Sequence, residues 1–240
     1  MRALLFSLAT FAVLAAAPVG AQESDYSTKE TRVLMHAYAK CVVGRRPAKA
    51  SEAIVRNVDN GTILRDYQSL VVGECLARQV LETTMMRFGG DLYRYALADA
   101  LVNRELPNAP APDLAAVQQL DHRDPGPVPQ QIAANGKKLS RRAYEAAVKG
   151  HERSAAFSFL SRYGECVVRS NAAGAKALLL TRPDSAEETA QFGALRPALA
   201  SCLPEGEMLK FGRTTLRGTV AINYYRLVQA ARAAETKAAS

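Results

Sequence analysis

The sequence predicts an all-α protein built from two homologous, disulfide-stapled helical halves, of about four helices each, packed with pseudo-twofold symmetry. Apolar residues recur at helical rather than alternating spacing. Four cysteines fall into two pairs of similar separation, and short motifs around them occur twice in the same order. The 240 residues suffice for one buried core or two small ones.

The first 21 residues are predicted to be a secretory signal outside the fold. Arg2 gives a positive start, an apolar run covers 4–17, and Val19-Gly20-Ala21 places small residues where signal peptidase cuts. An uncleaved membrane anchor is the alternative, but a run of about 14 residues is short against the roughly 20 that span a bilayer. We expect a mature chain that starts at Gln22 and is periplasmic or secreted.

The internal repeat is carried by matched motifs. Tyr38-Ala-Lys-Cys41-Val-Val recurs as Tyr163-Gly-Glu-Cys166-Val-Val, and the next cysteine follows after 34 residues (Cys75) or 36 residues (Cys202). A Met-x-x-Phe-Gly motif then occurs at 85–89 and 208–212, with Arg94 and Arg217 six residues beyond each phenylalanine. We interpret this as a duplicated domain, with halves over 22–106 and 139–235.

The repeat also selects a disulfide pairing. Exported chains meet an oxidising compartment, and four cysteines allow three pairings. Equivalent halves should close equivalent loops, which predicts Cys41–Cys75 and Cys166–Cys202. No Cys-x-x-Cys motif is present, so a thiol oxidoreductase is disfavoured.

In the first half, Ser27 and Glu30 form a capping box, and the helix it starts carries an apolar stripe. The stripe consists of Val33, Leu34, Ala37, Tyr38, Cys41 and Val42. A short helix is predicted over 47–56, then a turn at 57–61 with positive φ suited to Asn60-Gly61. A third helix should carry 64–75, residues 85–88 should be extended, and a fourth helix should span 91–103.

The second half repeats this plan. Helices are predicted over 151–169, 172–180 and 213–234, and Ser185 with Glu188 forms another capping box before a helix that ends near Cys202. Residues 107–138 hold six of the eleven prolines and are predicted to be a linker, with a short helix over 113–120. The piece 139–149 should join the next helix through Gly150, and 236–240 should be a frayed tail.

The histidines and acidic residues give no catalytic motif. His36 could be a general base, but a partly exposed helix histidine is the plainer interpretation. His122 follows Asp121 in the linker, where adjacent residues do not form a triad. With three histidines in the whole chain and no metal-ligand spacing, no metal and no cofactor is predicted. Glu187-Glu188 fits a first helical turn better than a catalytic pair.

Positive charge is the one feature that suggests a partner. The mature chain carries +7, of which +6 follows residue 106, where 18 basic residues face 12 acidic ones. The densest pairs are Arg45-Arg46, Lys137-Lys138 and Arg141-Arg142. They suggest an anionic envelope component, against the alternative of a merely solvated surface. No nucleic-acid motif is present.

Arg94 and Arg217 are the weak candidates for anion contact, because the repeat places them at matched positions. The alternative is that each pairs with a nearby carboxylate or carbonyl group. Tyr38 and Tyr163, each three residues before a cysteine, should pack near the disulfides.

The order CVV…CL…FG…R after an alanine-rich signal resembles uncharacterised exported helical proteins of alpha-proteobacterial type, over 25–106 and 150–235. The resemblance implies export, helices and disulfides, and it carries no activity.

These features favour an exported, periplasmic, non-catalytic binding or scaffold protein whose partner is an unknown protein or an anionic envelope component. The alternative is a small envelope enzyme with a site between the two halves. A deep cleft with a carboxylate of raised pKa would favour the enzyme, and an exposed apolar patch would favour a protein partner. A third hypothesis is association with an anionic membrane surface.

Overall fold

The computed structural model describes residues 29–77, 90–114, 117–132, 136–204 and 212–238. The predicted signal at 1–21, the capping residue Ser27 and most of the two Met-x-x-Phe-Gly motifs lie outside these residues, so the expectations placed on them stay predictions. The described part of the predicted tail, 236–238, continues the last helix.

The described chain is all-helical, which confirms the all-α part of the predicted fold class. The first part holds α1 (Lys29–Arg45), α2 (Pro47–Val55), α3 (Asn60–Asp66), the 3-10 turn η1 (Gln68–Leu70), α4 (Gly73–Ala77) and α5 (Leu92–Glu105). The second part holds α6 (Arg141–Ser170), α7 (Ala172–Leu179), α8 (Ala186–Ser201) and α9 (Arg213–Ala238). Among the described residues, β-structure is limited to one isolated bridge between Ile132 and Lys138.

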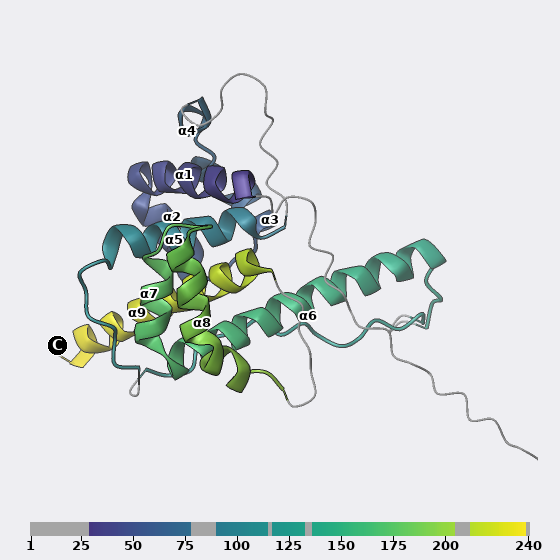
Figure 1. Cartoon of the computed structure of the whole chain (residues 1–240). Helices are drawn as coiled ribbons and strands as arrows, with labels where there is room; N and C mark the ends of the chain where they lie inside the picture. Colours follow the sequence, from purple (N-terminus) through teal and green to yellow (C-terminus); the bar gives the residue numbers. More distant parts are fainter. Residues whose placement is uncertain (1–28, 78–89, 115–116, 133–135, 205–211, 239–240) are drawn as a thin grey trace, which may run out of the picture.

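Helices α5 and α9 form the centre of the core (Figure 1). Every residue of 93–102 and of 217–228 is buried, as expected for helices surrounded by other helices. α1, α2 and α3 pack on α5, whereas α2, α6 and α7 pack on α9. The two central helices cross at Gly218, where a Cβ atom would overlap the ring of Tyr95. Only glycine fits this crossing.

Both predicted disulfides are present. Cys41–Cys75 joins α1 to α4, and Cys166–Cys202 joins α6 to the C-terminal end of α8. The matched tyrosines lie nearby in matched roles. Tyr38 Oη accepts a hydrogen bond of 3.0 Å from the backbone N–H of Val72, and Tyr163 Oη donates one of 3.0 Å to the carbonyl of Leu199. The backbone partner in each bond, Val72 or Leu199, lies three residues before the second cysteine of the neighbouring disulfide.

The apolar stripe predicted for α1 is rotated in the structure. Val33, predicted to be buried, is 44% exposed, whereas Arg32 and Met35 are buried. The buried face is Arg32, Met35, Tyr38, Ala39, Val42 and Val43. A charged residue belongs to this face because its guanidinium is paired with buried carboxylates, which offsets the cost of desolvation.

The third helix predicted for 64–75 is wrong as one element, because the chain breaks there into α3, η1 and α4. Side chains satisfy backbone groups that a continuous helix would use: Val72 N–H bonds to Tyr38, and Tyr93 Oη donates to the carbonyl of Leu70. The predicted turn is also displaced. Positive φ falls on Asn57 (52°), and Asn60 begins α3 behind the capping residue Asp59.

The described residues of 107–140 form an extended strap along α6, and the helix predicted over 113–120 is absent from them. Side chains of the second half hold the strap by its backbone. Arg169 donates to the carbonyls of Leu114 (3.0 Å) and Gln118 (2.7 Å), and Glu165 accepts from the N–H of Leu120 (3.1 Å). The predicted junction through Gly150 is confirmed, since α6 runs unbroken from Arg141.

Candidate functional site

A buried charge network joins α1, α5, α8 and α9. Its centre is Arg217, which is 5% exposed. The guanidinium donates to Asp99 Oδ1 from Nε (3.1 Å) and Nη2 (2.9 Å), and to Glu188 Oε1 from Nη1 (3.1 Å). It also donates to the carbonyls of Leu178, Leu179 and Thr181. All three guanidinium nitrogens of Arg217 are therefore hydrogen-bonded within the protein. This agrees with the structural alternative for Arg217, in which it pairs with carboxylate and carbonyl groups, and not with anion binding.

The network extends from Arg217 through its two carboxylates. Glu188 accepts two hydrogen bonds from Arg32, at 3.0 and 3.2 Å, and Arg32 also donates to Asp184. On the other side, His36 Nδ1 lies 2.8 Å from Asp99 Oδ2. Sequence reasoning placed Glu188 in a helix cap. Its N–H does bond to Ser185 Oγ (3.1 Å), but its fully buried carboxylate serves both arginines.

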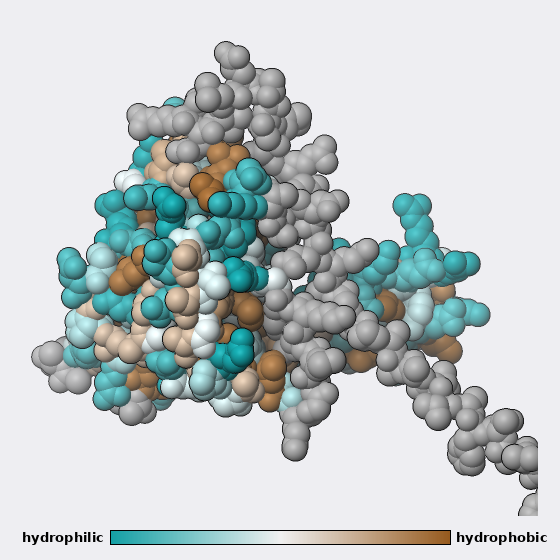
Figure 2. Space-filling view, viewed as in Figure 1, coloured by the Kyte–Doolittle hydropathy of each residue, from teal (hydrophilic) through white to brown (hydrophobic). Residues whose placement is uncertain are grey.

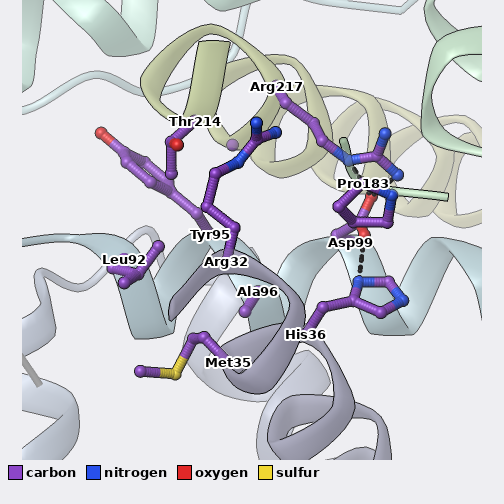
Figure 3. Close-up of a pocket in the computed structure, with 11 residues that line it drawn as sticks. Arg32, Met35, His36, Leu92, Tyr95, Ala96, Asp99, Pro183, Thr214 and Arg217 are labelled. Atoms are coloured by element: carbon purple, nitrogen blue, oxygen red, sulfur yellow. Dashed lines mark hydrogen bonds and ion pairs between the residues drawn. The ribbon is translucent and has the colours of Figure 1, made fainter. Parts of the chain in front are cut away.

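A cavity of about 40 Å³ lies beside this network (Figure 3). Its walls come from α1, α5, α9 and Pro183, and Figure 3 shows His36 beside Asp99 at one end, with Met35 and Leu92 toward the other. Pockets for small-molecule ligands typically measure about 300–1,000 Å³. A cavity of this size accommodates about three water molecules.

The chemistry available in the cavity is limited to a proton acceptor. The side chain of His36 is 24% exposed, and its Nδ1 lies at Asp99. Nε2 is therefore the ring nitrogen that remains to accept a proton. The hydroxyl groups on the described walls belong to Tyr95 and Thr214. Burial raises the pKa of Tyr95, which makes its phenol a poor nucleophile. Among the described lining residues, no nucleophile is hydrogen-bonded to the histidine.

Arg94 lies in a different environment from Arg217. It is 4% exposed, donates to Asn57 Oδ1, and its guanidinium lies 4.5 Å from the centre of the Phe157 ring. Arg123 lies 4.7 Å from the same ring. Burial lowers the pKa of Arg94. Arg94 thus links α5, the turn after α2, and α6, and the two predicted anion contacts do not converge on one site.

His122 is held in an arrangement that the sequence analysis missed. Its Nδ1 lies 2.8 Å from Ser161 Oγ, its Nε2 lies 2.5 Å from Glu165 Oε2, and its side chain is 4% exposed. Burial lowers the pKa of His122, and the nearby Glu165 opposes this effect. The sequence signal that could have revealed this group is the spacing of Ser161 and Glu165, which lie one helical turn apart on α6.

The Ser161–His122–Glu165 group has the residue types of a hydrolytic triad but not the access of one. Ser161 is 5% exposed and also accepts a hydrogen bond of 3.1 Å from Asn57 Nδ2. The Ser158 hydroxyl further fastens the strap by donating to the carbonyl of Arg123 (2.6 Å). The geometry therefore makes His122 a clamp that holds the strap on α6.

The most exposed feature of the described chain is an arm. We define it as residues 141–156 of α6 with strap residues 125–132 and 136–140. No residue of 141–156 is buried, whereas burial on α6 begins at Phe157. Figure 1 shows this part of α6 projecting from the rest of the described chain, which we call the body. Figure 2 shows a largely hydrophilic arm with hydrophobic patches.

The described residues offer neither a metal centre nor a membrane-spanning helix. They contain no group of three or more His, Cys, Asp or Glu residues placed to hold a metal ion. No described helix is long and apolar enough to cross a membrane. Comparison of the chain with protein-family models, with curated proteins and with solved structures gave no match.

Proposed function

We propose that the chain is an exported, periplasmic, non-catalytic binding or scaffold protein that meets its partner through the arm. The observation that carries the proposal is the absence of any buried residue in 141–156 of α6. Isolated helices of about 12–15 residues are marginal in water, and most helices in proteins are stabilised by packing an apolar face. One face of this helix end is only half-buried, at 144, 147, 148, 151, 154 and 155, and a partner that covers the exposed remainder would supply the missing packing.

Export is supported by the predicted signal and by two disulfides, which persist in oxidising compartments. The body then serves as the support. Arg32 and Arg217 are paired with carboxylates inside it, and its central helices are buried over 93–102 and 217–228, so it presents the arm from a rigid base.

We propose further that the body is a duplicated domain with pseudo-twofold symmetry. Equivalent contacts support this. Arg94 bonds to Asn57 just after α2, and Arg217 bonds to Thr181 just after α7. Asp59 and Ser185 cap the next helices through the N–H three residues on. α6 extends 25 residues before Cys166, whereas described α1 extends 12 before Cys41, so the arm is an addition to the repeated plan.

A second candidate is a small envelope enzyme with its site in the cavity between the halves. The observation that favours it is His36 Nδ1 at 2.8 Å from Asp99, a geometry that suits a general base. The volume of about 40 Å³ and the lack of a nucleophile among the described lining residues favour the binding protein.

Photo-crosslinking in intact producing cells separates the two. A photoreactive residue is placed in the arm at Ala143 or Ala146, and for comparison in the body at Arg196, which is also exposed. The binding proposal predicts a discrete crosslinked product from the arm and none from the body. Absence of any product from the arm, with a small molecule that co-purifies with wild type and is lost in His36→Gln, would favour the enzyme.

A further inference from the structure

We propose that the tip of the arm, residues 125–132 and 136–144, binds the surface of a bilayer that contains anionic lipids. This inference rests on the proposed function, since it names the partner of the arm. Four cations and two exposed aliphatic side chains carry it, together with their place at the end of a projection.

The tip is uniformly basic. It holds Lys137, Lys138, Arg141 and Arg142, and the sequence has no Asp or Glu between 125 and 144. Arg141 is 91% exposed and forms an ion pair of 2.8 Å with Glu145, the first carboxylate after the tip. Each Lys or Arg near an anionic bilayer strengthens binding about fivefold.

Two of these cations stand at the wrong end of a helix for its own stability. Arg141 and Arg142 begin α6 behind the capping residue Ser140, and the first turn holds no acidic residue. The helix macrodipole places partial positive charge at this end, so cations there are unfavourable within the chain. An external anion is attracted both by the arginines and by the helix end, which gives the unfavourable placement a function.

The same tip carries the two most exposed large aliphatic residues described. Val128 is 70% exposed and Ile132 is 61% exposed. The bridge between Ile132 and Lys138, with Leu139 N–H bonded to Gln131 O (2.8 Å), places Ile132 beside the cations. Gly136, with φ of 77°, lies two residues before Lys138. Val128 is four residues from Ile132, so their Cα atoms are at most about 14 Å apart.

A projecting tip with aliphatic side chains among cations suits the bilayer interface, where apolar groups enter the headgroup region and cations meet phosphates. An acidic protein would use the cations but would not require aliphatic side chains held out on a projection. The observations therefore favour a lipid surface, with Val128 and Ile132 entering it.

The test uses the purified mature chain and co-sedimentation with vesicles of phosphatidylcholine alone or mixed with phosphatidylglycerol. Lys137→Gln/Lys138→Gln removes two cations from the tip, and Val128→Ser/Ile132→Ser removes the aliphatic groups. The matched controls are in the body: Arg196→Gln/Arg232→Gln changes the net charge equally, and Val55→Ser/Val71→Ser changes exposed valines. All of these side chains are exposed, and circular dichroism checks the fold of each variant.

We expect binding to the anionic vesicles only, weakened by salt. The cation variant should partition about 30-fold more weakly, from two cations at the usual gain for each. The aliphatic variant should also bind more weakly, while both controls match wild type. An environment-sensitive dye on Ile132→Cys should shift to the blue with vesicles, whereas the same dye on Val55→Cys should not.

Equal losses in the tip and body variants would show unspecific attraction and overturn the inference, as would no binding to anionic vesicles. An arm that crosslinks to a protein in cells but ignores vesicles would overturn the lipid inference alone. An arm that neither crosslinks nor binds vesicles would overturn the proposed function as well.

Discussion

Arg32 of α1 and Glu188 of α8 are joined by hydrogen bonds of 3.0 and 3.2 Å, although 156 residues separate them in the sequence. Glu188 also bonds to Arg217 (3.1 Å) and is fully buried, so one carboxylate ties the first helix to the last. Groups buried in this way are costly to desolvate, and removal of one leaves its buried partners with fewer charge-assisted hydrogen bonds.

We therefore expect Glu188→Gln to destabilise the fold by about 1.5–3 kcal/mol, since two buried guanidinium groups would lose their charge-assisted hydrogen bonds to it, while Arg32 keeps Asp184 and Arg217 keeps Asp99. The matched control is Glu187→Gln, one residue earlier and exposed, with an expected change within about 0.5 kcal/mol. Urea unfolding at neutral pH measures both. Equal effects of the two substitutions would refute the structural role of the network.

Alanine substitutions at two glycines should change stability in opposite directions: a loss at the α5–α9 crossing and a gain on α8. Gly218→Ala forces a methyl group onto Tyr95 and should cost about 1–3 kcal/mol. Gly193 lies in α8 with no atom near its added Cβ, so Gly193→Ala should stabilise by about 0.5–1 kcal/mol through helix propensity. Thermal unfolding measures both, and a Gly218→Ala variant as stable as wild type would mean the helices cross elsewhere.

The matched tyrosines should matter to a similar degree. Tyr38→Phe leaves the N–H of Val72 without its bond, and Tyr163→Phe does the same to the carbonyl of Leu199. Each should lower the unfolding free energy by about 1–2 kcal/mol. Tyr144→Phe, on the arm, is the control and should change little. A loss at only one of Tyr38 and Tyr163 would count against equivalent halves.

Acidification should loosen the strap at His122. Because burial lowers its pKa in the folded state, the unfolded chain binds the proton more tightly. Its contribution to stability is therefore complete above the unfolded pKa of about 6.5 and declines as the pH falls toward the folded value. His122→Gln should flatten this part of the stability curve, measured by urea unfolding from neutral to mildly acidic pH. Wild type and variant curves that stay parallel would contradict this role.

Much of the fold follows from local sequence. The helix cap at Ser185 and the pairing of the four cysteines depend on a local signal and on repeat spacing, and the structure confirms both. The positions that failed depend on contacts far along the chain. Arg32 is buried because of Glu188, and the helix after α3 breaks because Tyr38 and Tyr93 take its backbone groups.

The candidate sites were less accessible to sequence reasoning for the same reason. His36 meets Asp99 across 63 residues, and His122 meets Ser161 across 39. Neither spacing is a local motif. The basic pairs at the tip of the arm were visible in the sequence, but their projection from the body depends on where α6 leaves the core, at Phe157.

The proposed contact with the partner lies on the arm and not in the cavity beside His36. Amide hydrogen exchange of the purified chain, alone and with the envelope fraction of producing cells, tests it directly. We predict slower exchange in residues 141–156 and in the strap residues beside them, with no change around His36, Tyr95 and Thr214. Protection confined to the residues around the cavity, with an unchanged arm, would contradict the account.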